Sequence, residues 1–387
     1  MTIVLFDEER ARKNLLPLTF TRPVCEIRIG ILTIKEKWET AMHATVSYLT
    51  QTHLSKKFPL HTGGETLYVN GKICPDFALI NTIKKLRVKQ AIYKGDTLVA
   101  FFGSAFDLSD SINHDKIEYT ENIFEINQLW EIFQKNGEAI QSDFDLITKN
   151  RKTQVLSDSV TVIGNRSHVF IEENAKAEAC ILNTKGGPIY IGKDAEIMEG
   201  SAVRGPFSLG EHSTLKLSTK IYGATTIGPH CKVGGEVSNS VIFGYSNKAH
   251  DGFMGNSVVG EWCNFGADSN VSNLKNNYGS VKLYNYAQEK MVNTGLQFCG
   301  LIMGDHSKSG INTMFNTGTV VGICSNIYGS GFPPTHIESF SWGGSEGFVV
   351  YKLEKLFETE EKVYERRGIA FSEVEKELLS AVFAKTT

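Results

Sequence analysis

The sequence lacks the features that mark a membrane, secreted or nucleic-acid-binding protein. No stretch approaches the apolar length of a membrane span, and residues 1–13 place acidic side chains where a secretory signal needs a plain basic start. The net charge of the 387 residues is −3, and Lys and Arg are spread out without a basic cluster. We therefore expect a cytoplasmic protein with no membrane and no nucleic acid among its partners.

The chain also lacks the cysteine and histidine patterns of a disulfide-bonded or metal-binding protein. Its seven cysteines are an odd number, and none of them forms a CxxC pair. The histidines of the central region are too dispersed for a zinc site, which needs several ligands on neighbouring turns. We predict reduced, structural cysteines and no metal site. The histidines concerned are His212, His230, His250 and His306.

What the chain does contain is an aliphatic residue at every sixth position of its central region. A helix repeats near 3.6 residues and a strand at two, so this period fits short strands joined by tight corners. Three strands close a triangular coil of about eighteen residues, and stacked coils make a hexapeptide-repeat β-solenoid. The uninterrupted members of the repeat are Ile191, Ile197, Val203, Leu209, Leu215, Ile221, Ile227 and Val233.

The repeat continues in both directions, with shifts of phase. It runs from about residue 155 to 330, or about nine coils, and we assign residues 155–345 to a left-handed parallel β-helix. Residues 272–298 lose the period and are rich in Asn, Lys and Tyr, which predicts a binding loop. The outer members are Ile163, Val169, Ala175 and Ile181 upstream, and Phe253, Val259, Phe265, Val271, Met303, Ser309, Phe315, Val321 and Ile327 downstream.

The flanking regions predict an α/β domain before the solenoid and helices after it. In residues 1–150, short apolar runs alternate with helical patterns, which is typical of a Rossmann-like α/β layer. In residues 346–387, a helical period covers residues 348–367, and a second helix begins at Ser372 with a capping box to Glu375. We expect these helices to cap the open end of the solenoid. Within the first domain, strands are expected at residues 2–6, 66–69 and 97–102, and helices at 29–42 and 123–136.

The residue best suited to chemistry is His250, at the junction between two phases of the repeat. A neutral imidazole can take a proton from an amine or hydroxyl nucleophile near neutral pH. The alternative is a corner histidine bonded to a backbone carbonyl. The residues alone leave both interpretations open.

Several short motifs resemble the acetyltransferase half of the bifunctional GlmU family. They are Lys248-Ala249-His250, Phe253-Met254-Gly255, Asn264-Phe265-Gly266-Ala267 and the Asn-Asn-Tyr-Gly of residues 276–279. The run from Asn14 to Pro23 resembles the opening of a sugar-1-phosphate nucleotidyltransferase. The whole chain resembles GlmU-like proteins of Bacteroidetes-type bacteria. In this family, acetyl-CoA N-acetylates glucosamine 1-phosphate, and the product is then uridylylated.

The resemblance implies roles for residues of the solenoid. His250 falls on the catalytic base, Glu236 on the glutamate that orients it, and Asn264 on an amide that contacts the amino sugar. Ala267 falls on a backbone position beside the thioester of acetyl-CoA, whereas Phe253 replaces a tyrosine of the family. Further expected substrate-binding residues are Lys220, Lys248, Lys275, Asn277 and Tyr278, and further expected acyl-CoA-binding residues are Gly300 and Thr317.

The resemblance is weaker at the N-terminal nucleotide site. Such enzymes have a glycine-rich turn after the first strand, because glycine lets backbone N–H groups approach the phosphates. Here this turn reads Asp7-Glu8-Glu9-Arg10, and Asn70 stands where an aspartate would bind Mg²⁺. Either Arg10, Arg12 and Arg22 bind phosphates in a divergent site, or this reduced domain has lost or altered the reaction. Mg²⁺ is expected only if nucleotidyl transfer is retained.

The sequence thus predicts an acetyl-CoA-dependent N-acetyltransferase for an amino-sugar phosphate. One alternative is a sugar-1-phosphate nucleotidyltransferase, using UTP or dTTP, whose β-helix is an oligomerisation scaffold. Another is a non-catalytic protein that binds a nucleotide sugar. Because Leu283, Tyr284, Tyr286 and Met291 need cover, we expect residues 272–298 to pack on a neighbouring chain in a homotrimer.

Overall fold

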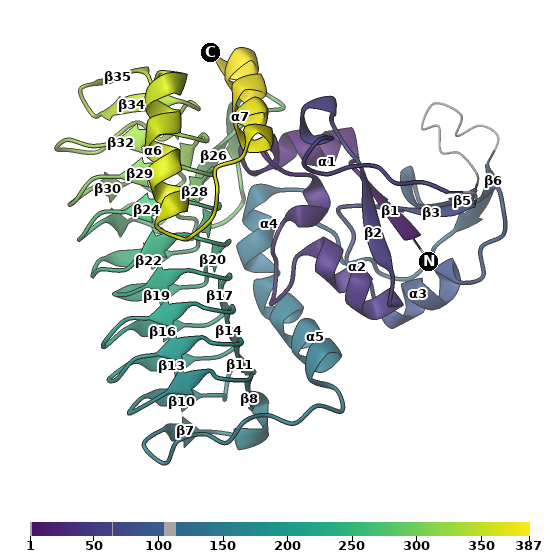
Figure 1. Cartoon of the computed structure of the whole chain (residues 1–387), viewed down its shortest axis with the longest axis horizontal. Coiled ribbons are helices and arrows are strands. Elements are labelled where there is room, and N and C mark those ends of the chain that lie inside the picture. Colours follow the sequence, from purple (N-terminus) through teal and green to yellow (C-terminus); the bar gives the residue numbers. More distant parts are fainter. Residues whose placement is uncertain (1, 64, 104–113) are drawn as a thin grey trace.

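The computed structural model describes residues 2–63, 65–103 and 114–387, which form an α/β domain, a β-solenoid and two C-terminal helices (Figure 1). The predicted fold class is confirmed. The α/β domain has a six-stranded sheet in the order β2-β1-β3-β5-β4-β6. Its strands are β1 (Thr2–Phe6), β2 (Thr45–Leu49), β3 (Thr66–Asn70), β4 (Gln90–Lys94), β5 (Thr97–Gly103) and β6 (Asp115–Glu118).

The helices of this domain differ from the predicted ones at their ends. The first long helix begins at Ile34 and not at residue 29, because Thr33 and Glu36 form a capping box there. The helix predicted for residues 123–136 is short and is followed at once by a second helix that the sequence pattern did not predict. The helices are α1 (Glu9–Asn14), α2 (Ile34–Met42), α3 (Phe77–Ile83), α4 (Leu129–Gln134) and α5 (Asn136–Thr148).

The solenoid has three faces of parallel strands, and the uninterrupted aliphatic repeat points inward as predicted. The prediction was wrong for Ile163 and Ile181 upstream, which are 38% and 44% exposed, because their neighbours Val162 and Leu182 point inward instead. Every member of the uninterrupted repeat from Ile191 to Val233 is at most 1% exposed. Face 2 contains nine strands, in agreement with the predicted nine coils. Face 1 comprises β7 (Thr161–Ile163), β10 (Ile181–Asn183), β13 (Ala202–Arg204), β16 (Lys220–Tyr222), β19 (Glu236–Ser238), β22 (Phe253–Gly255), β25 (Asn270–Val271) and β30 (Met314–Phe315).

The other two faces run alongside it. Face 2 comprises β8 (Val169–Ile171), β11 (Ile189–Ile191), β14 (Phe207–Leu209), β17 (Thr225–Ile227), β20 (Val241–Ile242), β23 (Val258–Val259), β28 (Ile302–Met303), β31 (Val320–Val321) and β33 (His336–Ile337). Face 3 comprises β9 (Lys176–Ala177), β12 (Glu196–Ile197), β15 (Thr214–Leu215), β18 (Lys232–Val233), β21 (Asn247–Lys248), β24 (Asn264–Phe265), β29 (Lys308–Ser309), β32 (Asn326–Ile327), β34 (Ser341–Gly344) and β35 (Gly347–Val350).

The α/β domain packs on face 2 through α4 and α5 (Figure 1). The Asn136 side chain donates a hydrogen bond to the Ala224 carbonyl at 2.8 Å, and the Thr226 hydroxyl donates one to the Gly30 carbonyl at 2.8 Å. Apolar side chains of both parts form a single core cluster. The two parts are therefore held together by shared packing as well as by buried hydrogen bonds.

The excursion of residues 272–298 contains a hairpin, β26 (Lys282–Asn285) and β27 (Lys290–Asn293), which packs on the α/β domain of its own chain. Leu283 is fully buried there, and the Tyr286 ring meets Phe20 edge-on at 5.5 Å. The Asn285 amide donates to the Asn14 side chain at 3.3 Å. The prediction that these apolar residues need a neighbouring chain was wrong for Leu283 and Tyr286, because the α/β domain of the same chain covers them, whereas Met291 is 39% exposed.

The C-terminal helices are α6 (Leu353–Glu365) and α7 (Glu373–Thr386). Ser372 caps α7 as predicted, accepting a hydrogen bond from the Glu375 N–H at 3.3 Å. The helix predicted from residue 348 begins at Leu353, because the residues before it form β35, which pairs with β34 at the end of face 3. A strand therefore extends the last coil, and α6 lies along face 3 (Figure 1).

A ladder of aromatic rings runs along the corner between faces 2 and 3. Tyr245 stacks on Trp262 at 4.3 Å, and Trp262 stacks on Tyr364 of α6 at 3.9 Å. His212 and His230 extend the ladder below. His212 and His230 stand at equivalent corner positions of successive coils because their rings stack in this ladder. Among the residues that the structure describes, no group of side chains could hold a metal ion.

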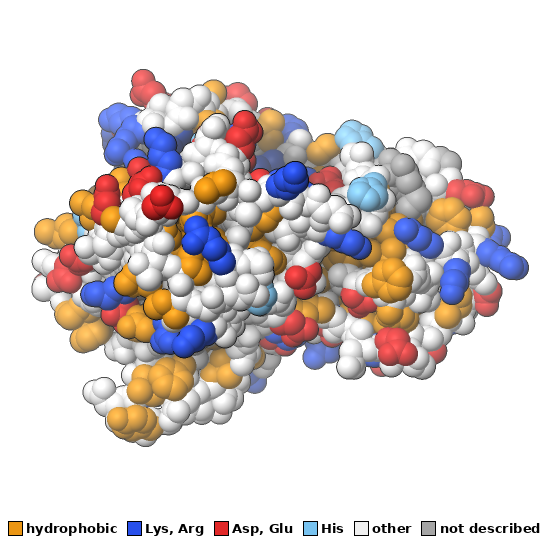
Figure 2. All heavy atoms as spheres, turned by 90° about the horizontal axis from the view of Figure 1, so that it is seen from below, with side chains coloured by type: hydrophobic (Ala, Val, Ile, Leu, Met, Phe, Trp, Pro, Cys, Tyr) orange, Lys and Arg blue, Asp and Glu red, His pale blue; other side chains and the backbone are white. Residues whose placement is uncertain are grey.

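The surface of the molecule carries charges of both signs. On the face seen in Figure 2, basic and acidic side chains are interspersed. No helix among the described residues has the length and apolarity that a membrane span requires.

Candidate functional site

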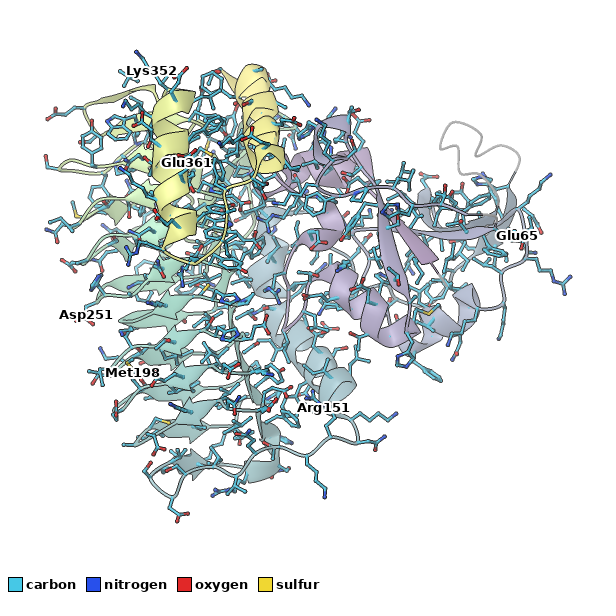
Figure 3. The ribbon with its side chains drawn as sticks, viewed as in Figure 1. Glu65, Arg151, Met198, Asp251, Lys352 and Glu361 are labelled. Atoms are coloured by element: carbon cyan, nitrogen blue, oxygen red, sulfur yellow. The ribbon has the colours of Figure 1, made fainter. Side chains whose placement is uncertain are left out.

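His250 lies in a corner of the solenoid that is longer than the corner below it. Between faces 3 and 1, two residues connect β18 to β19, whereas residues 249–252 connect β21 to β22. Asp251 of this corner lies at the outer edge of the solenoid in Figure 3. The His250 side chain is exposed, and its imidazole makes no hydrogen bond within the described residues. The alternative of a histidine bonded to a backbone carbonyl was wrong.

A pocket of about 450 Å³ lies between this corner and α6. His250 and Asn264 both line it, so the structure brings together two residues that the sequence singled out. Asn247 pairs with Asn264 in register. His250 and Ala267 each follow three residues later, so they occupy equivalent corner positions in successive coils. The half-buried Ala267 is thus placed next to His250.

The pocket is lined by basic side chains and by no carboxylate among the described residues. Lys232, Arg366 and Arg367 line it, and no ion pair involves any of them in the part of the chain that the structure describes. The Arg367 guanidinium donates a hydrogen bond to the Asn247 side chain at 3.1 Å. Lys308 also lines the pocket, but its charge is paired with Glu360. Three uncompensated cations favour an anionic ligand here.

The sequence analysis did not predict Lys232, Arg366 or Arg367. Lys232 is an outward-facing residue of a face 3 strand, and the two arginines follow the end of α6. Only the packing of α6 on face 3 brings residues so distant in sequence into one pocket. Two consecutive arginines at the end of a predicted helix could have suggested an anion-binding site. The sequence does not indicate where that helix docks, so the pocket could not be predicted from them.

Other predicted residues lie apart from this pocket. Lys248 points into the solenoid and is 3% exposed, so a direct substrate contact does not fit its placement. Glu236 lies on β19 and makes no hydrogen bond to His250, and Lys220 is exposed on face 1. Phe253 is half-buried on the same face.

A further group lies at the opposite corner, between faces 1 and 2 of the same chain. Lys275 donates to the Ser280 carbonyl at 2.8 Å, the Asn277 side chain accepts from the Gly279 N–H at 3.0 Å, and Tyr278 is 67% exposed. Gly300 and Thr317 also lie at this corner, Gly300 being buried. Within one chain these residues are not next to His250, and their roles stay predictions.

A second pocket, of about 870 Å³, lies at the carboxyl ends of β1 and β3 in the α/β domain. It is lined by Arg10, which was predicted, and by Lys13, which was not. Asn70 lines it but is 1% exposed, and its amide donates to the Leu98 carbonyl at 3.0 Å. The remaining lining is Phe6, Asp7, Glu8, Glu9, Gln51, Asp96, Thr97, Leu98 and Ala287 at the tip of the hairpin.

Two of the arginines proposed to bind phosphates are placed elsewhere. Arg22 is buried, pairs with Asp305 and lies 3.3 Å from Glu261 of the solenoid. These two acids outweigh burial and raise the pKa of Arg22. Arg22 therefore joins the two domains, and a phosphate-binding role does not fit. Arg12 is half-buried and does not line the pocket.

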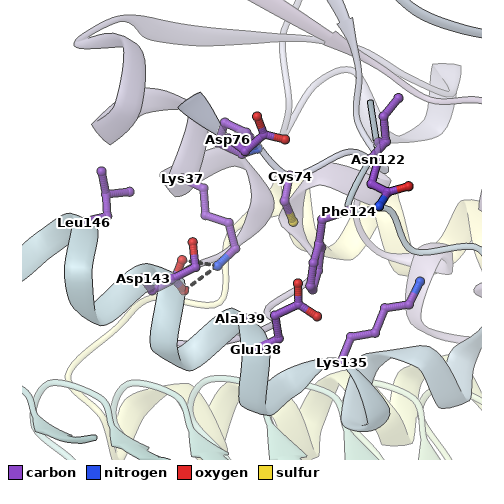
Figure 4. A pocket seen from close by; sticks show the side chains of 13 residues that line it. Lys37, Cys74, Asp76, Asn122, Phe124, Lys135, Glu138, Ala139, Asp143 and Leu146 are labelled. Atoms are coloured by element: carbon purple, nitrogen blue, oxygen red, sulfur yellow. Dashed lines mark hydrogen bonds and ion pairs between the residues drawn. The ribbon is translucent and has the colours of Figure 1, made fainter. Parts of the chain in front are cut away.

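A third pocket, of about 380 Å³, lies between α2, α5 and the residues before α4 (Figure 4). Lys37 and Asp143 form a buried ion pair in it, and Asp143 also accepts from the Ile31 N–H at 2.8 Å and the Leu32 N–H at 3.0 Å. Every oxygen of this carboxylate is thereby satisfied. The pair fixes α5 against α2 and the loop before α2, and we assign it a structural role.

Comparison with known proteins places the chain in a family context. Residues 3–152 match the family model described as sugar nucleotidyl transferase. The chain is 28% identical over 218 residues to the bifunctional sugar-1-phosphate nucleotidylyltransferase/acetyltransferase of Sulfurisphaera tokodaii, covering 55% of this chain and 46% of that protein. It is 33% identical over 121 residues to the bifunctional protein GlmU of Methanocaldococcus jannaschii, covering 31% and 27%.

The predicted resemblance to GlmU-like bifunctional proteins is confirmed by these matches, and residues 3–152 are similar to the sugar nucleotidyl transferase family. The match spans about half the length, or less, of these curated relatives. The polySia-specific acetyltransferase NeuO is a solved structure matched at 15% identity and a TM-score of 0.29, over 51% of this chain and 87% of that one. A likeness this low supports no functional argument.

Proposed function

We propose that the solenoid carries an acetyl-CoA-dependent N-acetyltransferase site for an amino-sugar phosphate of the glucosamine 1-phosphate type. The observation that carries this proposal is the pocket in which His250 and Asn264 meet three unpaired cations. An imidazole with no hydrogen-bond partner among the described residues, beside three basic side chains, suits an acceptor that bears both an amine and a phosphate.

In the proposed mechanism, Lys232, Arg366 and Arg367 bind the phosphate, and Asn264 contacts the sugar. The amine nitrogen attacks the thioester carbonyl of acetyl-CoA while His250 accepts the amine proton. A backbone N–H near Ala267 stabilises the oxyanion. As the tetrahedral intermediate collapses, the new C–N bond stays, the C–S bond breaks, and the imidazolium returns a proton to the CoA thiolate.

The phosphate site is tested by replacing Arg366 and Arg367 with alanine. Removing hydrogen bonds to a charged group is expected to raise KM for hexosamine 1-phosphate by about 10- to 100-fold. KM for the unphosphorylated amino sugar should stay unchanged. The measurement is CoA thiol release. Alanine at Lys352 and Lys355, at the other end of α6, is the matched control, and equal effects in both variants would contradict the proposal.

For the α/β domain we propose loss or alteration of nucleotidyl transfer, with nucleotide-sugar binding as the remaining function. The support is the two-residue connection between β1 and α1, Asp7-Glu8, which places carboxylates where phosphates would arrive. Burial raises the pKa of Asp7, which accepts hydrogen bonds from Val24 N–H at 2.8 Å and Thr50 at 2.5 Å. The alternative, active nucleotidyl transfer with UTP or dTTP and Mg²⁺, is favoured by Arg10 and Lys13 in the same pocket.

We therefore expect weak or no Mg²⁺-dependent pyrophosphate release from UTP or dTTP with hexose 1-phosphates. The assay is enzymatic detection of pyrophosphate, and calorimetric titration with nucleotide sugars tests binding alone. Arg10→Ala is the matched variant for the titration. Robust turnover with any pair of substrates would show that this divergent site is catalytic.

A homotrimer and a cytoplasmic location remain proposals. With the α/β domain on face 2 and α6 on face 3, face 1 is the surface left for contact between solenoids. It exposes Ile181 at 44% and Tyr222 at 43%. A trimer interface is thus expected there, and not at the hairpin of residues 282–293.

A further inference from the structure

Lys248 occupies a position inside the solenoid where the repeat otherwise places aliphatic side chains. It pairs in register with Val233 of the coil below, and Phe265 takes the corresponding position in the coil above. Both neighbours are buried, as is Lys248 at 3% exposure. Burying an ammonium opposes folding unless the group is hydrogen-bonded, so a lysine at this position calls for a reason beyond packing.

The ammonium makes two hydrogen bonds, both to carbonyls of the corners that connect face 3 to face 1. Nζ donates to the His250 carbonyl at 2.8 Å and to the Gly234 carbonyl at 3.1 Å. No ion pair involves Lys248 among the described residues. Asp251 and Asp268, in the corners of the same and the next coil, are the charged groups that face it, and each raises its pKa. Burial has the larger effect and lowers the pKa to about 8.

The backbone of the corner that carries His250 makes few other hydrogen bonds. No amide N–H of residues 249–252 donates a hydrogen bond within the described parts of the chain. The Gly252 carbonyl accepts from the Glu236 N–H at 3.2 Å, and Phe253 N–H then donates to the Asn270 side chain at 2.8 Å. Among the described residues, the bond to the His250 carbonyl is therefore the hydrogen bond that holds the backbone between Lys248 and Gly252, from which the imidazole projects.

We infer that Lys248 is a positioning residue, whose buried ammonium ties the corner carbonyls of two successive coils and thereby holds His250 towards the pocket. This inference rests on the proposed acetyl transfer at His250. In the Lys-Ala-His motif, the lysine thus holds the corner from inside the solenoid, and the histidine accepts the proton on the outside. A lysine at this position can reach both carbonyls, whereas an aliphatic residue of the repeat cannot bond to either.

The test is Lys248→Met, which keeps the length of the side chain and removes the hydrogen bonds. A displaced base is expected to lower kcat for acetyl transfer by about 10- to 100-fold. KM for the phosphorylated acceptor should change by less than about twofold, because Arg366 and Arg367 lie on α6. Phe265→Leu, in the adjacent interior position, is the matched control. It should lower Tm and leave kcat unchanged, since a phenyl ring cannot donate a hydrogen bond to a corner carbonyl.

A second readout does not depend on activity. The folded pKa of Lys248 is lowered, so the ammonium opposes folding at pH values below about 8. This opposition is lost as pH rises from about 8 towards the unfolded value near 10.5. Wild-type Tm should therefore lie at or below that of Lys248→Met at pH 7, and the difference should change in favour of the wild type between pH 8 and 9.5.

The two readouts separate the possible failures. An unchanged kcat in Lys248→Met would overturn the inference while leaving acetyl transfer at His250 intact. A wild-type protein without acetyl transfer, but with the expected pH dependence of Tm, would refute the proposed function and leave only a structural tie. If Lys248→Met does not fold, Lys248→Gln replaces it. Loss of folding in both would show that Lys248 supports the solenoid as a whole, which contradicts a local positioning role.

Discussion

Replacing His250 with alanine is expected to slow acetyl transfer by about 10²- to 10⁴-fold, the usual effect of removing a general base. The free energy of unfolding should change by less than about 0.5 kcal/mol, because the exposed imidazole has no hydrogen bond inside the described structure. The measurement is thiol detection of released CoA, combined with thermal unfolding. The effect should fall on kcat, since the cations that bind the phosphate remain.

The matched control for this variant is His212→Ala. His212 is also exposed on a corner of the solenoid, with 49% of its side chain accessible, but it belongs to the aromatic ladder and not to the pocket. Acetyl transfer should persist in this variant. Full activity in His250→Ala, or equal losses in both variants, would show that His250 is not the base.

The second large effect is expected from Glu360→Gln in α6. The Glu360 carboxylate is fully buried, accepts a hydrogen bond from His306 Nδ1 at 2.8 Å and forms an ion pair with Lys308 on face 3. Removing one partner of a buried ion pair leaves an uncompensated charge and typically lowers the free energy of unfolding by about 3–5 kcal/mol. We expect a loss of this size at pH 7, measured by denaturant unfolding. Glu361→Gln, an exposed neighbour paired with Lys376 at 3.2 Å, should lower it by less than about 1 kcal/mol.

Glu360 should also make the stability of the folded protein depend on pH. Burial raises the pKa of Glu360, but Lys308 and His306 outweigh burial and lower it to about 2. The stability that this carboxylate contributes is therefore present above its unfolded pKa of about 4.5 and is lost as pH falls towards 2. The wild type should lose stability across this window more steeply than Glu360→Gln. Parallel profiles for the two proteins would contradict the assignment.

The fold was predictable where local sequence decides the structure. An aliphatic residue at every sixth position can be buried only by a coil of short strands, so the repeat from Ile191 to Val233 predicted the solenoid. The capping box at Ser372 and Glu375 similarly predicted the start of α7. The boundaries of α2 and α6 were less predictable, because apolar residues before Ile34 and Leu353 fit a helix and a strand equally well.

The candidate site was predictable only in part. His250 and Asn264 lie on adjacent coils, so their separation along the chain is fixed by the repeat, and a sequence motif can indicate both. Arg366 and Arg367 belong to a helix whose docking depends on the stacking of Tyr364 upon Trp262. Such contacts between residues distant in sequence leave no periodic signal.

By itself, the sequence determined the three-part architecture and the identity of the candidate base, because periodicity and local motifs encode short-range structure. The tertiary structure alone decided that Arg22 joins the domains, that the hairpin covers its own α/β domain, and that Lys248 faces inward. Each of these depends on which surfaces meet. Whether a charged side chain binds a ligand or stabilises the fold depends on which group the packing places beside it. For Arg22, that group is Asp305 of the solenoid.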